Sequence, residues 1–408
     1  MIKKRIGMVA VGAALALAAT ACGSSGDESN AAQPDGSDLE LVIGSVWTEG
    51  DSESSSVSPV VASIDLAVQD IRDAGGNVRL LREDYGTDPD AASEAVNRLL
   101  AEGVHVILGA GSSQASQSFI QTLYDAQIPQ CAASNTSPSF STQENAAYFF
   151  RTVPPDEAVS PIVATLVAAD GASHVAIPAR DDDWGNALSN LLVESLGELG
   201  VSAEVVSYDP NATSFDPVVA AVQSTGADAV VFVTFSEGAE IIRGLVEAGM
   251  PATAMYGTDG IYDQNLAQVV NPSNPDVLDG FVMVAAGGNP AFNRRISGLT
   301  DGNVVWGGQA YDCVAVLMLA ALAADSTSGS AIIAEVPGVT KGGRQCFSYK
   351  ECALLVVDGV DIDYVGASGP LELDEVGDPT IGRYFVAELN FGVLTVIASH
   401  DVDLAEVD

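Results

Sequence analysis

Short runs of β-branched and other apolar residues alternate with amphipathic runs along most of this chain. From residue 39 the order is LELVIGSV, PVVASIDLAVQDIRDAGG, NVRLLREDY, AASEAVNRLLAEG and VHVILGAG, and a similar order resumes at residue 174 with HVAIPARDD. Strands separated by helices pair in parallel, with helices on both faces of the sheet. About 370 residues follow the N-terminal region, more than one hydrophobic core usually holds. The sequence therefore predicts an α/β fold with two doubly wound parallel-sheet lobes.

The C-terminal part of the chain departs from this alternation. Residues 369–399 read GPLELDEVGDPTIGRYFVAELNFGVLTVIAS, which is typical of short strands around turns. We expect this tail to return between the lobes.

The N-terminus has the order of a secretory signal. MIKKR precedes an apolar run of 16 residues, Ile6 to Ala21, followed by small residues. The run is shorter than the ~20 residues of a membrane span. Because Cys22 follows Ala-Thr-Ala, this region resembles a bacterial lipoprotein signal. We expect residues 1–21 to be the signal peptide and Cys22 to be lipidated, with an ordinary secreted protein as the alternative. Residues 22–39 should form a disordered tether.

The chain is strongly acidic. Without Lys3, Lys4 and Arg5, 13 basic residues remain against 55 acidic ones, a net charge of −42. Nucleic acid and anionic lipid surfaces would be repelled, so nucleic acid is excluded as a partner. Solubility in a salty habitat is an alternative reason for the acidity.

Four cysteines follow Cys22. Cys346 and Cys352 bracket a polar turn in CFSYKEC, where a disulfide and free thiols are about equally expected in an exported protein. Cys131 and Cys313 lie in apolar contexts. We interpret them as buried thiols, although nothing in the sequence excludes a bridge between them.

The loop LGAGSSQASQ (108–117) sits between an apolar strand and a helix, where parallel sheets bind ligands. It lacks the third glycine of GxGxxG and the GK[ST] of a P-loop, and no GxSxG occurs in the chain. Phosphate binding and a serine nucleophile are therefore disfavoured. Ser113 is placed to begin the helix and to face another anion, or one of the two serines simply caps the helix.

The sequence gives little support for a metal or cofactor. His105 and His174 fall inside apolar runs, His400 lies near the C-terminus, and no HExxH or Cys/His cluster occurs. The run 181–183, three aspartates, could bind a hard cation, but a solvated loop or a charge facing a cationic ligand fits it better. We expect no metal, no cofactor and no enzymatic activity.

Several motifs, in order, resemble one protein family. They include SIDLAVQDIRDAGG, VILGAGSSQAS, IPQCAASNTSPSFS, RTVPPD, ARDDDWGN, VVFVTFSEGAEIIRGLVEAG, QAYDCVAVLMLAA and GPLELDEVGDP. Together they span nearly all of residues 40–400 and resemble ABC-transporter substrate-binding proteins of the branched-chain amino-acid (Leu/Ile/Val-binding) type.

The resemblance implies a type I periplasmic-binding-protein clamshell whose two lobes are joined by a three-strand hinge. Residues 40–153 plus 287–380 would form lobe 1. Residues 154–286 plus 381–408 would form lobe 2. The ligand would be gripped between the lobes.

The resemblance also implies the ligand contacts. Ser113 would bind the ligand α-carboxylate. The loop at the end of the next strand, with Ser134 and Thr136, would hold the carboxylate and the α-amine. Glu237 in FSEGA would pair with the ammonium group and Trp184 in DDDWG would pack over the ligand. Asp259 in YGTDG is a weaker candidate on a neighbouring strand end.

The resemblance favours an extracytoplasmic solute-binding lipoprotein of an ABC importer. It would be a monomer, held at the bacterial membrane through Cys22, that delivers an amino acid or similar small polar solute to an ABC permease. The first crest loop contains Trp47, Glu49 and Asp51 instead of the family's usual TGP, which points to a bulkier, polar or cationic ligand. An amide, urea or aromatic-acid binding protein of the same fold and a sensory lipoprotein remain alternatives.

Overall fold

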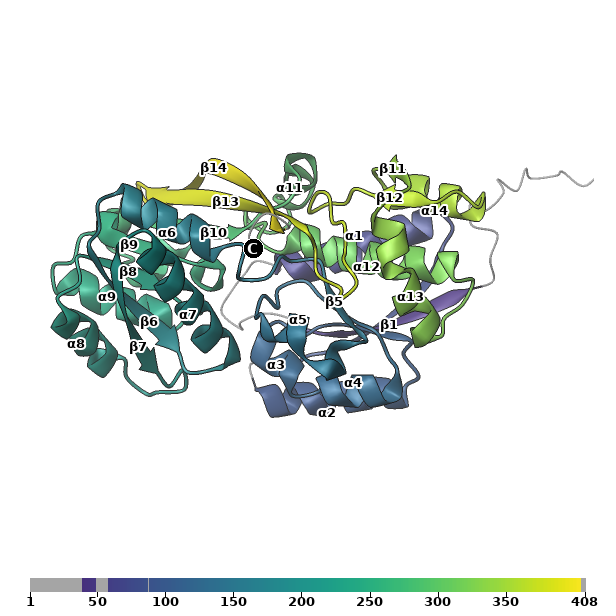
Figure 1. Ribbon diagram of the computed structural model, residues 1–408, viewed down its shortest axis with the longest axis horizontal. Helices are drawn as coiled ribbons and strands as arrows, with labels where there is room; N and C mark the ends of the chain where they lie inside the picture. Colours follow the sequence, from purple (N-terminus) through teal and green to yellow (C-terminus); the bar gives the residue numbers. More distant parts are fainter. Residues whose placement is uncertain (1–38, 49–57, 87, 405–408) are drawn as a thin grey trace, which may run out of the picture.

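The computed structural model describes residues 39–48, 58–86 and 88–404. The expected signal peptide, Cys22 and nearly all of the expected tether lie outside the described residues, as do Glu49 and Asp51. Two sheets lie side by side along the long axis of the molecule (Figure 1). We call the unit around the five-stranded sheet lobe 1 and the unit around the seven-stranded sheet lobe 2.

The sheet of lobe 1 is entirely parallel. From edge to edge its strands are β2 (Asn77–Glu83), β1 (Glu40–Val46), β3 (Val106–Gly109), β4 (Gln130–Ala132) and β5 (Phe149–Arg151). All but the first residue of β1 are buried, because helices cover both faces of the sheet.

The helices of lobe 1 form two layers with separate apolar cores. One layer contains α1 (Pro59–Asp73), α11 (Pro290–Ile296), α12 (Gly307–Ala323), α13 (Gly329–Thr340) and α14 (Tyr349–Val357). The other contains α2 (Pro89–Ala101), α3 (Ser113–Gln117) and α4 (Ile120–Ala126). The lobe is completed by α5 (Ser139–Thr142), η1 (Glu144–Ala146), β11 (Arg344–Cys346) and β12 (Ile362–Tyr364).

The sheet of lobe 2 is mixed. From edge to edge its strands are β14 (Val393–Asp403), β13 (Ile381–Asn390), β10 (Val282–Ala286), β9 (Met255–Gly257), β8 (Ala229–Phe232), β6 (His174–Arg180) and β7 (Ser202–Tyr208). The five strands from β10 to β7 are parallel, and β13 and β14 add an antiparallel hairpin. The tail thus forms two long strands of 10 and 11 residues, not the short strands expected from its turns.

Helices cover both faces of this sheet as well. One face carries α6 (Ser160–Ala169) and α7 (Asp183–Glu198). The other carries α8 (Asp216–Thr225), α9 (Gly238–Glu247) and α10 (Leu266–Val270). Short 3₁₀ turns are η2 (Ala252–Ala254), η3 (Asp259–Ile261) and η4 (Pro275–Leu278). Within the described ranges, no helix has the length and apolar character to cross a bilayer.

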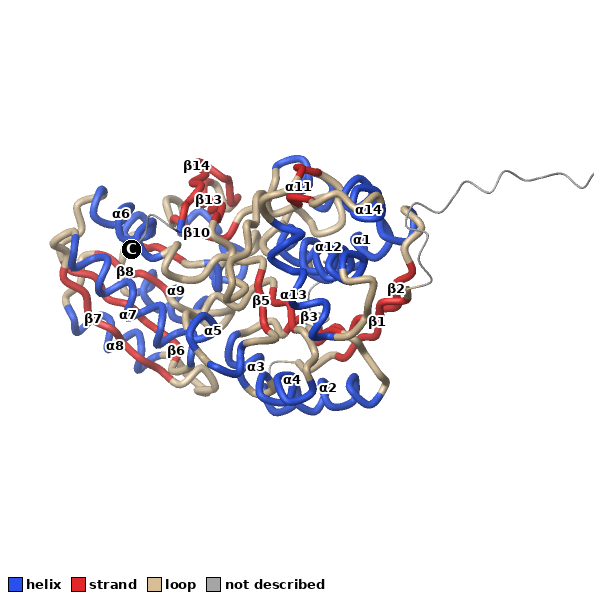
Figure 2. The backbone as a smooth tube through the Cα atoms, turned by 45° about the vertical axis from the view of Figure 1, so that its right-hand side comes forward, coloured by secondary structure: helices blue, strands red, loops and turns tan. Residues whose placement is uncertain are grey.

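The chain passes between the two sheets three times: after β5, after β10 and before β13. Figure 2 shows these links as loops through the middle of the molecule. The predicted α/β fold with two doubly wound lobes and a three-segment hinge is confirmed.

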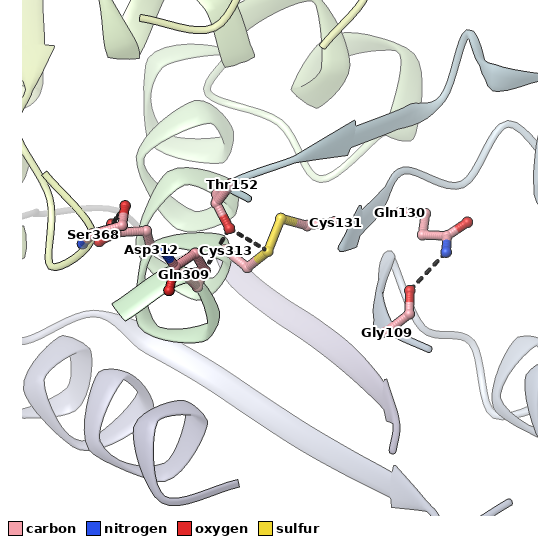
Figure 3. The surroundings of a disulfide bond; sticks show 8 residues. All are labelled: Gly109, Gln130, Cys131, Thr152, Gln309, Asp312, Cys313 and Ser368. Atoms are coloured by element: carbon pink, nitrogen blue, oxygen red, sulfur yellow. Dashed lines mark hydrogen bonds between the residues drawn. A yellow bond between two sulfur atoms is a disulfide. The ribbon is translucent and has the colours of Figure 1, made fainter. Parts of the chain in front are cut away.

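The cysteine expectations need one correction. Cys131 and Cys313 are not free thiols but form a buried disulfide between β4 and α12, with Cα atoms 5.6 Å apart (Figure 3). These residues lie 182 positions apart, so no local pattern announced the pairing. Cys346 and Cys352 form the second disulfide, the one that the sequence left undecided.

Candidate functional site

The first strand end of the cleft is the loop that contains Ser113. A side chain at Gly109 would place its Cβ 2.1 Å from the Val46 carbonyl oxygen, so only glycine lets β3 end this close to β1. Ser112 caps α3 by accepting the Ala115 N–H at 3.2 Å, and Ser113 is the first residue of the helix. Ser113 is 3% exposed, and its Oγ accepts a long hydrogen bond, 3.5 Å, from the Ser137 N–H.

The second strand end follows β4 and lies against the first. The Ser134 hydroxyl donates to the Gly111 carbonyl at 2.9 Å, so this serine ties the two loops together. The buried Asn135 side chain donates to the Ala110 carbonyl at 2.9 Å and accepts from the Ser116 hydroxyl at 2.6 Å. These bonds fix the positions of Ser113 and Thr136 without using their hydroxyl protons.

Arg151, on β5, holds this second loop through hydrogen bonds to its backbone. Its guanidinium is fully buried and donates to the Asn135 and Ser137 carbonyls, both at 2.9 Å. Two further bonds, at 2.6 and 3.0 Å, pair it with the Asp378 carboxylate. Arg151 is therefore already neutralised, and its charge is not available to a ligand.

Two buried carboxylates interact with each other where the first link meets lobe 2. Asp156, on the first link between the lobes, is 0% exposed, and Asp259, at the start of η3 in lobe 2, is 4% exposed. The Asp156 N–H donates to the Thr136 carbonyl at 2.9 Å, which places it beside the second loop. Burial and repulsion from Asp259 raise the pKa of Asp156 well above its usual value. Burial also raises the pKa of Asp259, to about 6.

Two aromatic side chains border these carboxylates. Trp306 precedes α12 and packs against the cores of both lobes. Its indole N–H approaches Asp259 closely enough to lower the pKa of that carboxyl, but makes no hydrogen bond of normal geometry. Tyr384 on β13 is 2% exposed, and the Asp156 and Asp259 charges help burial to raise the pKa of its hydroxyl.

Trp184 lies at the start of α7, where its ring is 4% exposed. The ring stacks on Phe235, with centroids 4.8 Å apart and planes 15° from parallel. It also abuts the turn that carries Asp259, since a Cβ at Gly260 would lie 2.7 Å from Trp184 Cη2. The structure thus brings Trp184 and Asp259 together in lobe 2.

Glu237, which precedes α9, already has partners within lobe 2. Its Oε1 lies 2.5 Å from Arg180 Nη1 and accepts from the Tyr208 hydroxyl at 2.9 Å. The Arg180 guanidinium also pairs with Asp182 at 2.8 Å and stacks 4.2 Å from the Phe235 ring centroid. Glu237 is therefore a neutralised group, whereas Asp259 is not.

The three successive aspartates 181–183 serve separate local roles. Asp182 caps α7 through the Gly185 N–H at 2.8 Å, and Asp181 accepts from the Asn186 side chain at 3.1 Å. Asp183 reaches lobe 1, where the Ser139 hydroxyl donates to it at 3.1 Å. Among the described residues, no group of three or more His, Cys, Asp or Glu side chains could hold a metal ion.

Two of the three histidines make contacts within their own lobe. His105 Nδ1 accepts the Val42 N–H at 3.1 Å next to β1, and His174 Nδ1 lies 2.8 Å from the Ser202 hydroxyl at the β6–β7 pair. Both contacts tie neighbouring strands together.

Sequence reasoning missed several residues that shape this site. Arg151 and Asp156 were noticed only as part of the RTVPPD crossing, and Arg180 only as part of ARDDDWGN. Trp306 and Tyr384 were not singled out. Arg151 had one signal, a rare cation directly after the apolar residues of β5. The others had none, because their neighbours come from distant parts of the chain.

Comparison with known proteins places this geometry in a family. The family model described as "Periplasmic binding protein" matches residues 40–340. A Leu/Ile/Val-binding protein homolog from Brucella melitensis is 22% identical over 224 residues, 53% of this chain and 60% of that protein. An uncharacterized protein from Methanocaldococcus jannaschii is 27% identical over 175 residues, 40% of this chain and 42% of that protein. The chain thus spans about half the length of these curated relatives.

Solved structures share the fold at low identity. A leucine binding protein from Thermotoga maritima superposes with a TM-score of 0.73 at 19% identity, over 88% of this chain and 98% of that chain. A solute binding protein from R. palustris, in complex with 4-hydroxybenzoate, gives 0.72 at 16% identity, over 90% and 98%. The ligand class therefore varies among neighbours of one fold. The chain belongs to the periplasmic binding protein family and has the type I fold of its solved neighbours.

Proposed function

We propose that this protein is the lipid-anchored solute receptor of an ABC importer and captures an amino acid between its lobes. The observation that carries this proposal is the buried Asp259 of lobe 2, which forms no ion pair within the described residues and interacts with Asp156, itself bonded to the Thr136 strand end of lobe 1. The carboxylate of a zwitterion could accept hydrogen bonds from the hydroxyls of lobe 1, and its ammonium group could pair with Asp259 of lobe 2. Charges removed from water are costly unless they are paired and hydrogen-bonded.

Lobe 1 would bind the ligand carboxylate. Ser113 and Thr136 are buried at the crest of the sheet, and both hydroxyls can donate a proton to a carboxylate. Ser134 would act differently, because its hydroxyl already donates to Gly111. It would instead hold the crest in place and present its backbone carbonyl to the amine.

Lobe 2 would bind the ligand ammonium group. The sequence favoured Glu237 for this role over Asp259, but the contacts support the opposite order. An ammonium group at Glu237 would have to share this carboxylate with Arg180 or displace it. At Asp259, an ammonium group would offset the cost of keeping a buried carboxylate ionised, the cost that raises its pKa. Trp184, stacked on Phe235, would cover the nonpolar part of the ligand.

Hinge closure would commit the ligand to transport. Contacts that a ligand makes with both lobes favour the closed state and shift the population toward it. The closed monomer would then dock on an ABC permease, held near it by a lipid at Cys22 and the tether that follows. Cys22 lies outside the described residues, so its role here rests on the sequence alone.

A thermal-shift screen of the purified protein against amino acids, amides and aromatic acids tests this proposal. A ligand that binds the folded state raises the unfolding midpoint by mass action. We expect an amino acid to raise it, and Asp259→Asn and Ser113→Ala each to abolish the shift. Glu237→Gln should reduce it less than Asp259→Asn.

The screen also includes aromatic acids as an alternative ligand class, because the R. palustris neighbour was solved in complex with 4-hydroxybenzoate. An acid without an amine would sit beside two buried carboxylates and gain no ion pair from them. A shift with 4-hydroxybenzoate and none with any amino acid would overturn the amino-acid assignment and leave the fold and family untouched.

A further inference from the structure

Asp156 is a buried carboxyl group that forms no ion pair within the described residues. It is 0% exposed, and among the described residues neither carboxylate oxygen makes a hydrogen bond of normal geometry, although the Thr136 hydroxyl lies close enough to lower the pKa of this carboxyl. Helix capping does not explain it, because α6 begins at Ser160 without a side-chain cap. The nearby Arg151 is committed to Asp378 and to two backbone carbonyls. Leaving a carboxylate in this state costs several kcal/mol unless a ligand or a proton relieves it.

A second polar group in the same place also lacks a partner. The Tyr384 hydroxyl is 2% exposed and makes no hydrogen bond to the described residues. Tyr384 is contributed by β13, Asp156 by the first link, and Asp259 by η3. Pro154 lies against this group as well, since a Cβ at Gly382 would be 2.4 Å from Pro154 Cγ and 3.4 Å from the Tyr384 ring. The first link, the strand after the third link and η3 of lobe 2 therefore converge on two acids and one unpartnered hydroxyl.

The lobe 2 residues near this group are also predominantly acidic. On the lobe 2 side, Arg180 pairs with both Asp182 and Glu237, and Asp181 and Asp183 follow in the same loop without an ion pair among the described residues. One α-ammonium group could neutralise Asp259 but would leave Asp156 unpaired. A ligand with a second positive group would neutralise both.

We propose that the ligand is a basic amino acid with two ammonium groups, one bound at Asp259 and the other at Asp156 with the Tyr384 hydroxyl as an additional contact. This assignment rests on the proposed function, the capture of an amino acid in the cleft, and adds the substrate class. The α-carboxylate remains on Ser113 and Thr136. The second ammonium group distinguishes this ligand from the branched-chain amino acids.

Calorimetric titration of the purified protein with matched amino acids tests the assignment. L-Lysine and L-ornithine carry a second ammonium group, and L-norleucine and L-norvaline are the same chains without it. We expect the wild-type protein to bind at least one basic amino acid about 10-fold or more tightly than its uncharged counterpart, a difference typical of one buried ion pair. This comparison requires no variant and stands even if substitutions impair folding.

Substitution then locates the second ammonium group. Asp156→Asn keeps the shape of the side chain and should weaken lysine or ornithine binding about 10-fold or more while leaving norleucine within about 2-fold. Asp259→Asn should weaken all four ligands. Asp73→Asn, on the exposed end of α1, removes the same charge far from the cleft and should change none of them.

The outcomes separate the two proposals. If norleucine or norvaline binds as tightly as lysine and ornithine, the basic-ligand assignment is wrong, while amino-acid capture is retained. If a basic amino acid binds tightly but Asp156→Asn leaves its affinity unchanged, the role of Asp156 is wrong. If none of the four ligands, and no other amino acid, binds to the protein, the proposed function itself fails.

Discussion

The role of a buried charged residue in this protein depends on whether an opposite charge pairs with it. Arg151 and Asp378 are buried together, and the same guanidinium holds the loop with Ser134 and Thr136 through two carbonyls. Glu237 is equally charged but is satisfied by Arg180 and Tyr208. Asp156 and Asp259 form no ion pair within the described parts of the chain. The difference between a structural charge and a ligand-binding charge therefore lies in what surrounds it.

Arg151 should be among the most sensitive single positions for stability. Arg151→Met leaves the Asp378 carboxylate buried without its partner, and we expect a loss of about 3–5 kcal/mol in the free energy of unfolding. Urea denaturation measures it. Arg98→Met removes a cation whose side chain is 52% exposed and should cost far less, because solvent screens exposed ion pairs. Equal losses in the two variants would contradict the role of Arg151.

The pKa of Asp259 predicts how ligand binding depends on pH. An ammonium ligand requires the ionised carboxylate, and burial raises the pKa of this group to about 6. Affinity for an amino acid should therefore fall as the pH drops through 6. Titration calorimetry at pH 8, 7, 6 and 5 measures it. Affinity that stays constant over this range in the wild type would argue against Asp259 as the ammonium partner.

The stability of the ligand-free protein should change in the opposite direction. The folded carboxyl of Asp259 binds its proton more tightly than the unfolded one, whose ordinary pKa is 3.8. Its contribution to the free energy of unfolding therefore rises as the pH falls from above 6 toward 4. Urea denaturation of wild type and Asp259→Asn across this range isolates the contribution. A contribution that decreases on acidification would show that the carboxyl is not destabilised by burial.

At the scale of elements, the crests of β3 and β4 form one rigid unit. Their loops are joined by Ser134, Asn135 and Ser116, and the Cys131–Cys313 disulfide anchors β4 to α12 directly beneath them. The Thr152 hydroxyl, at the end of β5, donates to the Gln309 carbonyl at 2.8 Å and lies 3.5 Å from the Cys313 sulfur (Figure 3). Lobe 1 therefore presents its binding loops on a preorganised support.

The two disulfides should contribute unequally to stability. In the chain-entropy treatment, a bridge stabilises more when it closes a longer loop. The separations of 182 and 6 residues correspond to roughly 5 and 2 kcal/mol respectively. We expect the Cys131→Ala/Cys313→Ala pair to lower the free energy of unfolding more than the Cys346→Ala/Cys352→Ala pair, as measured by urea denaturation. The reverse order would show that packing, not chain entropy, dominates.

At the scale of the whole molecule, the two lobes touch across the cleft mouth. Ser139 at the start of α5 donates to Asp183 at the start of α7, and α3 lies beside α7 as well (Figure 1). Gln117 and Ser137 hold the Ser139 hydroxyl from lobe 1, at 2.9 and 3.0 Å. These contacts exist only when the lobes are close together, so they stabilise that arrangement.

Loss of the contact between the lobes should weaken ligand binding without changing the ligand's own contacts. Asp183→Ala removes an acceptor worth about 0.5–1.5 kcal/mol, which corresponds to roughly 2- to 10-fold weaker affinity. Asp181→Ala is the matched control, because the hydrogen bond of the Asp181 carboxylate to Asn186 lies within lobe 2. Calorimetry compares the two variants. Unchanged affinity in Asp183→Ala would mean that this contact does not contribute to closure.

Local pattern was sufficient to predict the elements and their class. The alternation of apolar and amphipathic runs indicated parallel strands and covering helices, and the loop after β3 was correctly expected to begin a helix at Ser113. These features depend on residues close together in sequence, through side-chain periodicity and the preferences of turns. The long β13–β14 hairpin was underestimated because its turn residues suggested shorter strands, while sheet pairing extended them.

Which charges are paired was decided only by the tertiary structure. Arg180 comes 57 residues before Glu237 and Arg151 comes 227 residues before Asp378, so neither neutralisation could be read from a motif. The same holds for the Cys131–Cys313 bridge and for the meeting of Asp156, Asp259 and Tyr384. The sequence by itself determined the lobes and the kind of groups at their strand ends. The folded chain decided which of those groups remain unpaired, because electrostatic and hydrogen-bond partners are set by distance in space and not by separation along the chain.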